Sequence, residues 1–320
     1  VNSRTGFILT IGHSLNDKTG TVLFEECKFN NCGIGSTKAL VDFKSIKDGA
    51  GTCRFTSCSF YYDKSEQSCQ IIVALSSGIT FESCEFTRCK SNTIHLNVQP
   101  TTSATTTGNF EFINNKIYEM RSQFIRGNNV QGKINISSNL FRDIRLSGSY
   151  FIYIEHDQQF IELKNNTFST FVVDGNDNIN FGGISTCLKC TNNQLSSRCS
   201  MKYDHCSFCD IVNSCSMSNG GAIQFGFSSD FNQNDLILSN CHFRYNQAGK
   251  NGGAVAIQTF GSVTIRSCLF EDNKANSNHE SSIKLLADKE GRGGALFISI
   301  GNATDHAERP VIKQCTFKRN

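Results

Sequence analysis

The stretch "CHFRYNQAGKNGGAVAIQ" (Cys241–Gln258) recurs in altered form further along the chain. "CLFEDN" (Cys268–Asn273) is followed by "GGALFI" (Gly293–Ile298), and "CTFKRN" occupies Cys315–Asn320. Side chains alternate between the two faces of a strand, so the Cys and the Phe of each copy share one face. The pattern therefore predicts short strands in which two inward residues flank one outward polar residue.

Further copies of this pattern precede the stretch, with Cys or Asn in the first place and Phe or Ile in the third. They are "CKFNNC" (Cys27–Cys32), "CRFTSC" (Cys53–Cys58), "CSFYYD" (Cys58–Asp63), "CEFTRC" (Cys84–Cys89), "NKIYEM" (Asn115–Met120), "NLFRDI" (Asn139–Ile144), "NTFSTF" (Asn166–Phe171) and "CSFCDI" (Cys206–Ile211). Counted from Cys58 rather than Cys53, most copies begin near 27 residues apart. A repeat of this size cannot bury its apolar face alone and must stack on its neighbours.

Other short strands are expected around the copies, at Gly78–Ser83, Ile134–Ser138, Leu236–Asn240 and Val263–Ser267, and after Gly-Gly at Ala222–Phe227, Ala254–Phe260 and Ala295–Ile300. Two or three strands per repeat, separated by polar turns, predict an all-β fold: a right-handed parallel β-helix, or solenoid, of roughly ten or more coils. The alternative is an antiparallel sandwich or propeller, whose strands recur more closely and are joined by hairpin turns.

The conspicuous residues of the repeat are assigned to architecture rather than to chemistry. Cys and Phe fill the interior, Asn caps a turn or forms a ladder, and Gly-Gly-Ala turns a crowded corner, where glycine permits positive φ. These framework residues are Cys241, Phe243, Asn246, Gly252, Gly253, Ala254, Cys268, Phe270, Asn273, Gly293, Gly294, Ala295, Cys315, Phe317 and Asn320.

The composition limits the possible partners. The 320 residues are 38% hydrophobic and 18% charged with a net charge of +3, and no basic run indicates nucleic acid. No apolar run approaches the roughly 18 residues of a membrane span. We expect a single domain over residues 1–320, a fragment of a longer chain because it stops inside a repeat, and no cofactor.

The pairing of Phe-x-x-Asn with Gly-Gly-Ala-[Ile/Leu/Val] resembles a known signature. It is carried by "FRYNQAGKNGGAV" (Phe243–Val255), "SNGGAI" (Ser218–Ile223), "FEDN" (Phe270–Asn273), "RGGAL" (Arg292–Leu296) and "FKRN" (Phe317–Asn320). It is similar to the repeat of the chlamydial polymorphic membrane proteins and of related parasite proteins. The resemblance covers Ser218–Asn320 and implies a surface-exposed parallel β-helix, in several members an adhesin. In the first half Gly-Gly-Ala is absent and Phe-x-x-Cys or Phe-x-x-apolar replaces Phe-x-x-Asn, so that half resembles only the wider β-helix class.

The 16 cysteines allow three interpretations. Cys187, Cys190, Cys206 and Cys209 have the C-x2-C-x15-C-x2-C spacing of a zinc site. Together with Cys199 and Cys215 they instead make an even set of six that could form disulfides tying down a cysteine-rich insertion at about residues 186–203. The third possibility is reduced thiols, which pack well as small buried hydrophobes.

The runner-up function is a polysaccharide lyase or glycoside hydrolase, since enzymes of this kind use the fold. Its candidate catalytic acids are Glu155, Asp157, Asp174 and Asp177, because paired carboxylates can act as acid and base. These acids do not recur in one column of neighbouring repeats, so the preferred interpretation places them at solvated turns. A third possibility is a zinc-stabilised scaffold.

The preferred hypothesis is a non-enzymatic, extracellular or cell-surface β-helix that acts as an adhesin, a rigid spacer or a component of an assembly. Its flat faces, rich in Asn, Ser, Thr and Lys, would bind protein or glycan partners, and its coils could assemble end to end or laterally. Three glycosylation sequons, at Asn135, Asn165 and Asn302, are consistent with secretion.

Overall fold

The computed structural model describes most of the repeated segments and leaves out parts of the connections. The described residues are 9–12, 21–30, 41–44, 52–62, 71–74, 78–89, 94–97, 109–121, 123–130, 133–147, 151–156, 160–174, 186–189, 200–213, 218–225, 235–259, 261–275, 293–300 and 309–320. In this part of the chain the regular structure is all β, with no helix.

Three long sheets contain most of the strands. The first sheet holds β1 (Leu9–Gly12), β4 (Val41–Lys44), β7 (Ile71–Ala74), β10 (Ile94–Asn97), β13 (Ile125–Val130), β16 (Ile152–His156) and β19 (Thr186–Lys189). The second holds β2 (Thr21–Glu25), β5 (Thr52–Thr56), β8 (Gly78–Glu82), β11 (Phe110–Ile113), β14 (Ile134–Ser137), β17 (Phe160–Lys164), β20 (Ser200–Asp204), β23 (Asp235–Ser239), β27 (Val263–Arg266) and β31 (Val311–Lys313).

The third sheet holds β3 (Lys28–Asn30), β6 (Ser59–Tyr61), β9 (Glu85–Thr87), β12 (Lys116–Tyr118), β15 (Leu140–Ser147), β18 (Thr167–Asp174), β21 (Ser207–Asn213), β24 (His242–Arg244), β28 (Leu269–Glu271) and β32 (Thr316–Lys318), with β25 (Gln247–Ala248) and β29 (Lys274–Ala275) beside its path. A fourth, short sheet joins β22 (Ile223–Phe225), β26 (Val255–Thr259) and β30 (Leu296–Ile300).

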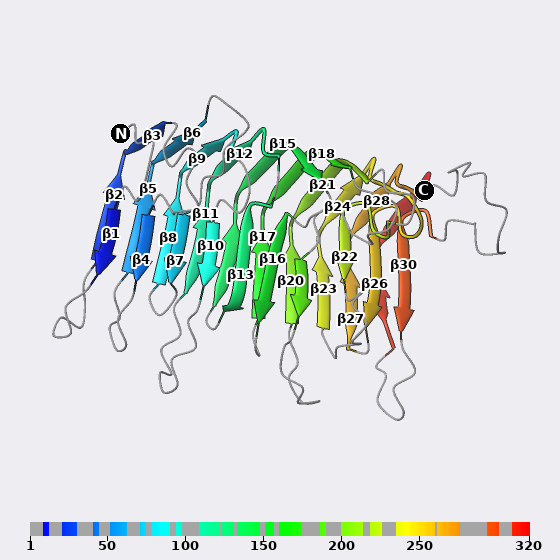
Figure 1. The fold of residues 1–320 in the computed structure, drawn as a ribbon. Coiled ribbons are helices and arrows are strands. Elements are labelled where there is room, and N and C mark those ends of the chain that lie inside the picture. The colour runs from blue at the N-terminus through cyan, green and yellow to red at the C-terminus, as the bar shows by residue number, and fades with distance from the viewer. Residues whose placement is uncertain are drawn as a thin grey trace, which may run out of the picture.

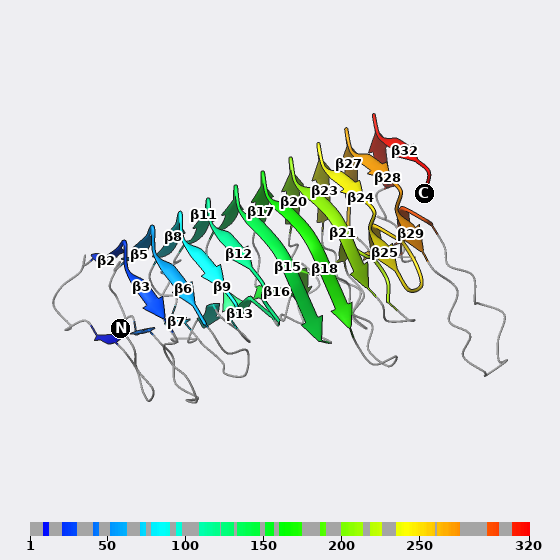
Figure 2. The ribbon, with the colours of Figure 1, turned by 90° about the horizontal axis from the view of Figure 1, so that it is seen from above.

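All described strand pairs are parallel, which excludes the antiparallel alternative for these segments. Along the first part of the chain, consecutive strands lie in the first, second and third sheets in turn and then return to the first. We call each such round of the chain a rung. Figure 1 shows the rungs side by side in chain order, and Figure 2 shows the third sheet from above. This arrangement is compatible with the predicted β-helix.

The repeat copies lie at the corner where the chain passes from a strand of the second sheet to a strand of the third. This holds for all ten copies that begin at Cys27, Cys58 and their equivalents. The first residue of the copy immediately precedes the third-sheet strand, as Cys84 precedes β9 and Asn139 precedes β15. The expected strands at Gly78–Ser83, Ile134–Ser138, Leu236–Asn240 and Val263–Ser267 correspond to β8, β14, β23 and β27, each one residue or so shorter or shifted. Those expected after Gly-Gly correspond to β22, β26 and β30.

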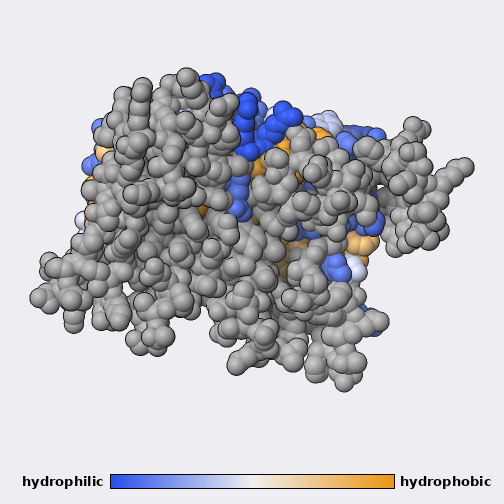
Figure 3. All heavy atoms as spheres, viewed as in Figure 1, coloured by the Kyte–Doolittle hydropathy of each residue, from blue (hydrophilic) through white to orange (hydrophobic). Residues whose placement is uncertain are grey.

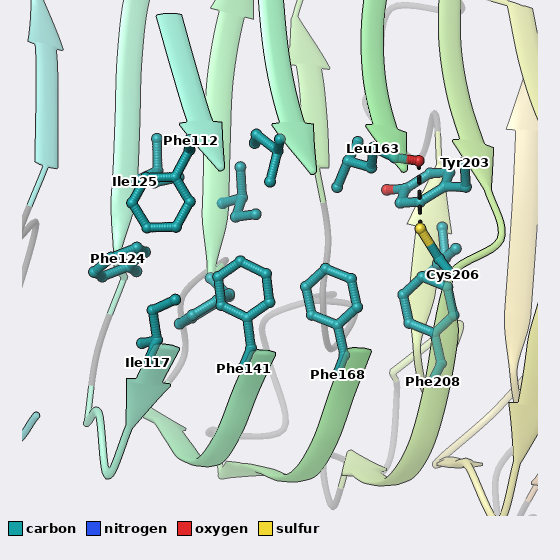
Figure 4. Close-up of a cluster of buried hydrophobic side chains, with 14 of the residues drawn as sticks. Phe112, Ile117, Phe124, Ile125, Phe141, Leu163, Phe168, Tyr203, Cys206 and Phe208 are labelled. Atoms are coloured by element: carbon teal, nitrogen blue, oxygen red, sulfur yellow. Dashed lines mark hydrogen bonds between the residues drawn. The ribbon is translucent and has the colours of Figure 1, made fainter. Parts of the chain in front are cut away.

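A column of phenylalanines fills the interior beneath the third sheet. The register places Phe141, Phe168 and Phe208 on successive rungs, with ring centroids 4.7 and 5.0 Å apart and planes within 7° of parallel (Figure 4). The column runs from Phe29 to Phe317 and is broken by Ile117, where Phe124 packs edge-on against Phe86 instead. Each fully buried ring contributes about 1.5–3 kcal/mol by leaving water, so this column is a main source of stability.

The corner between the second and third sheets depends on left-handed backbone. The residue before the Cys or Asn of each copy has φ between 50° and 58°, and none of these residues is glycine: Glu26, Ser57, Ser83, Asn114, Ser138, Asn165, His205, Asn240, Ser267 and Gln314. Except for Gln314, in the last described rung, their N–H groups donate to carbonyls of the next rung, as Ser83 does to Ile113. Parallel stacking therefore continues through the corner and offsets the cost of this conformation.

The Cys or Asn that begins a repeat copy follows this left-handed residue. Its side chain donates a hydrogen bond to a backbone carbonyl of the preceding rung, and Cys and Asn do this in the same way. Asn139 Nδ2 donates to the Phe112 carbonyl at 2.8 Å, and Cys206 Sγ donates to the Leu163 carbonyl at 3.3 Å. Cys58, Cys84, Asn115, Asn166, Cys241 and Cys315 make the equivalent bond. Cysteine and asparagine alternate in this column because each supplies a buried donor at the same place.

The Asn of Phe-x-x-Asn repeats this chemistry at the far end of the third-sheet strand. Asn246 Nδ2 donates to the Phe208 carbonyl at 2.9 Å and Asn273 Nδ2 to the Phe243 carbonyl at 3.0 Å. In the first half of the chain, Cys89 Sγ contacts the Phe60 carbonyl at 3.8 Å from the same position. The change from Phe-x-x-Asn to Phe-x-x-Cys therefore keeps the donor.

Asn139 tests this account. Asn139→Ala leaves the buried Phe112 carbonyl and Asn115 N–H without their partners, so we expect a loss of about 3 kcal/mol in the free energy of unfolding. Asn139→Cys keeps a donor toward Phe112 and should lose clearly less. Urea unfolding measures both, and equal losses in the two variants would contradict the shared role of Cys and Asn.

Gly-Gly-Ala makes a corner in which backbones of neighbouring rungs approach closely. Gly252 has φ of +60°, and a Cβ added to Gly253 would lie 2.0 Å from the Gly294 carbonyl oxygen. Ala254 is fully buried beside them. Only glycine at position 253 allows this approach.

Gly253→Ala is therefore expected to destabilise the protein by about 3 kcal/mol, since relief of the overlap requires the backbone to move. Gly78→Ala is the matched control, because its Cβ would lie no closer than 3.5 Å to any neighbour. Thermal unfolding should show a large drop in Tm for the first variant and little change for the second. Equal Tm values would overturn this account of the corner.

Candidate functional surface

The predicted catalytic acids are not gathered by the described structure. Glu155 lies in β16 of the first sheet, in register with Lys189, and Asp174 ends β18 of the third sheet, in register with Ser147. Asp157 and Asp177 lie outside the described residues. The two acids that the structure does place are thus on different sheets.

The predicted zinc ligands are separated in a similar way. Cys206 is interior, whereas Cys209 lies on the outer face of β21, with its Sγ 3.4 Å from Ser207 Oγ. Cys187 belongs to β19 in the first sheet, and Cys190 lies outside the described residues. Among the residues that the structure places, no three His, Cys, Asp or Glu side chains form a group that could hold a metal ion. A single ion could not be reached by both Cys206 and Cys209 in this geometry.

The ten cysteines whose side chains the structure describes form no disulfide. The free thiols are those of Cys27, Cys53, Cys58, Cys84, Cys89, Cys206, Cys209, Cys241, Cys268 and Cys315. The disulfide prediction for Cys206 and Cys209 is therefore not matched, because Cys206 is used as a buried donor to backbone. Cys187 lies in a strand whose side chains are not described, and Cys190, Cys199 and Cys215 lie outside the described residues.

The predicted insertion at about residues 186–203 is narrower than expected. Its first four residues form β19, and residues 200–203 belong to β20, so both ends are strands of the first and second sheets. Period-two alternation in "SMKYD" places Met201 and Tyr203 in the core. The alternation, and not the length of the gap between repeats, marks this end of the segment as a strand.

Hydrogen bonding between stacked thiols shifts their ionisation. A hydrogen bond from Cys84 lowers the pKa of Cys58 to about 7 although burial opposes the shift, and the same contact raises the pKa of Cys84. Burial raises the pKa of Cys53 to about 12. These thiols lie in the interior, so the low pKa of Cys58 does not by itself make a reactive site.

The outer faces carry ladders of paired polar side chains that run from rung to rung. Lys202 Nζ lies 2.9 Å from Glu162 Oε1, and Arg54 pairs with Glu82. On the third sheet, Arg88 Nε lies 2.5 Å from Glu119, and Arg319 binds both Asp272 and Glu271. Exposed pairs such as these each contribute little to stability, about 0–1 kcal/mol, but they neutralise charge along the faces.

Asp204 is the most enclosed acid of these ladders, with 14% of its side chain exposed. Burial opposes ionisation, but the hydrogen bond from Asn240 and the charges of His205 and Lys202 outweigh it and lower the pKa of Asp204. Its ionised form is therefore favoured by folding. A lowered pKa suits a structural anion rather than a general acid, which needs a raised pKa.

A pH dependence of stability follows. Because the folded-state pKa of Asp204 is below the unfolded value of about 3.9, its contribution is present above that value and is lost as pH falls through the folded pKa. Between about pH 5 and pH 2, the unfolding midpoint should fall more steeply in the wild type than in Asp204→Asn. Asn240→Ala, which removes one cause of the shift, should lie between them, and superimposable profiles for all three would rule the effect out.

Two of the sequons lie in described strands or corners. Asn135 is on the outer face of β14, in the middle of the second sheet, and Asn165 is exposed at the corner before β18. Asn302 lies outside the described residues. Both described asparagines project away from the core.

Hydrophilic residues dominate the described surface along the upper edge of the face in Figure 3, and apolar residues appear there only in patches. In the described part of the chain there is no helix that is long and apolar enough to cross a membrane. The fold and the surface together define a class of protein. It is an all-β protein of parallel strands stacked in register, with rows of oppositely charged, paired side chains on its outer faces. Comparisons with protein-family models, with curated proteins and with solved structures give no match.

Proposed function

We propose that the sheets close into a right-handed parallel β-helix that acts as a non-enzymatic structural or adhesive component, exposed on a cell surface or outside the cell. Right-handed crossovers are the rule for parallel strands of one sheet. The observation that carries the proposal is the unbroken register of the second and third sheets over ten rungs. Ten strands at about 4.8 Å give a stiff body about 45 Å long, suited to a spacer or a binding rod.

The separation of roles between interior and exterior supports this function. The repeat residues Cys, Asn, Phe and Gly make the contacts that hold neighbouring rungs together, as Asn246 and Gly253 do. The outward positions remain free to vary, and their charges are largely paired. A protein or glycan partner bound through many weak contacts, or a second copy alongside, fits such faces.

The cysteines do not support the proposed location, because the described ones serve as interior donors or, for Cys209, stay free on the surface. The location rests on the sequons and on the likeness of Phe-x-x-Asn and Gly-Gly-Ala to the repeats of polymorphic membrane proteins. For a polysaccharide-cleaving enzyme we find no favouring observation among the described acids, since the resolved pKa shifts of Asp204 and Asp272 are both downward.

Purified protein tests the proposal directly. We expect a rod-shaped particle in small-angle scattering, no bound zinc in metal analysis, and adhesion of protein-coated beads to cells or extracellular matrix well above that of beads coated with an unrelated protein. Acidic polysaccharides should keep their length after incubation with it. Depolymerisation that is lost in Asp157→Asn but kept in Asp235→Asn would overturn the proposal in favour of an enzyme, and stoichiometric zinc would favour the zinc-stabilised scaffold.

A further inference from the structure

The outer face of the third sheet carries two tyrosines in one column between β6 and β12. Tyr61 and Tyr118 both project outward, because each follows a buried residue, Phe60 or Ile117, on its strand. They occupy the same column: Tyr61 is in register with Thr87, and Thr87 with Tyr118. Both side chains are half-buried.

The spacing in this column is fixed by the strands. Tyr61 and Tyr118 are separated by two rungs, or about 10 Å. Small Thr87 lies between them, so the two aromatic side chains are not crowded by a third large residue. The distance between these two aromatic side chains is similar to the length of a disaccharide unit in an extended glycan that runs along the stack.

Polar groups beside the column hold this arrangement. Arg88, at the corner after β9, donates from Nη1 to the Tyr61 hydroxyl at 3.5 Å and from Nε to Glu119 at 2.5 Å. One guanidinium thus links the rung of Tyr61 to the rung of Tyr118. Preorganised aromatic groups lose little conformational entropy on binding, which favours their use in recognition.

The charge of this face indicates a neutral partner. The outward charged residues from β9 to the end of β15 on this sheet are Glu85, Arg88, Lys116, Glu119, Arg142, Asp143 and Arg145, three negative and four positive. Six of them have an opposite charge beside them: Glu85 is in register with Lys116, Arg88 binds Glu119, and Arg142 Nε lies 3.2 Å from Asp143 Oδ2. A strongly acidic or basic ligand therefore gains little from charge on this face.

Resting on the proposed adhesive function, we propose that this face binds a neutral, extended polysaccharide, with sugar rings packed on Tyr61 and Tyr118. The hydroxyl of Thr87 within the column and the guanidinium of Arg88 beside it would hydrogen-bond the sugar hydroxyls. The two tyrosines would bind sugar rings that are two rungs apart. Because most charges of the face are paired with one another, an acidic polysaccharide would gain little extra electrostatic attraction.

Affinity electrophoresis and pull-down with soluble and insoluble neutral polysaccharides, including β-1,4-linked glucan, chitin, xylan and mannan, test this site in the full chain. The wild type should bind at least one of them, and binding should persist in high salt. Tyr61→Ala and Tyr118→Ala should each weaken it at least tenfold, and the double variant should abolish it. Tyr245→Ala is the matched control, since Tyr245 is an exposed tyrosine outside the column and should be dispensable.

Two further variants separate ring stacking from fold effects. Tyr61→Phe keeps the ring and should bind within a few fold of the wild type. Tyr118→Thr combined with Thr87→Tyr moves the tyrosines to adjacent rungs and should bind as weakly as Tyr118→Ala. Circular dichroism and Tm confirm that each variant is folded.

Several results would overturn the site. They are no binding of the wild type to any neutral polysaccharide, wild-type binding by the double alanine variant, or salt-sensitive preference for an acidic one. If the double variant loses no adhesion in the bead assay while the wild type adheres, this inference fails and the proposed function stands. If the wild type neither adheres nor binds glycans, both fail.

Discussion

Parallel stacking in register at one strand spacing is the constraint on which everything else in the chain depends. Every side chain has an equivalent about 4.8 Å above and below it, so a residue type is tolerated only if it can stack on its own kind or on a close substitute. Phenylalanine satisfies this with rings such as Phe208 and Phe243, whose planes are within 2° of parallel. Asparagine satisfies it because its amide both donates and accepts along the stack.

The same constraint explains why cysteine is common without forming disulfides in the described segments. At the start of the third-sheet strands, and at the far end of several of them, a carbonyl points toward the next rung. Asn139 and Cys206 supply the donor at one corner, and Asn246 and Cys89 supply it at the other. A thiol is a weaker donor than an amide but a better hydrophobe, so each rung trades hydrogen-bond strength against burial. Corner geometry thus accounts for most of the cysteines whose side chains are described.

Interior features were largely accessible from the sequence because they repeat. Aligning the copies on Cys or Asn was enough to predict strands such as β23 and β27 and the inward direction of Phe243. The left-handed corner was missed, since Ser57, Glu26 and His205 share no side-chain property and glycine was expected at positive φ. At Cys206 a local spacing motif, which suggested zinc, coincides with the period of the whole chain, and the described structure uses this residue as a buried donor to backbone. The tyrosine column was visible at the fourth position of "CSFYYD" and "NKIYEM", but only once the register was known did the two become neighbours in space.

Function is the least predictable part for a physical reason. Each residue of an interior column packs against the rungs on both sides, so one unsuitable residue disturbs two neighbouring rungs. The interior columns can therefore be recognised in the sequence as a repeat. Outward residues are constrained only by charge compensation with the next rung, as in Arg88 with Glu119 or Arg319 with Asp272. A binding face on such a protein must therefore be recognised by an arrangement that stacking does not require. Paired charges recur on several rungs, whereas two tyrosines kept apart by a threonine occur in one column of the described third sheet. That difference is what sets the face of Tyr61 and Tyr118 apart from the other ladders.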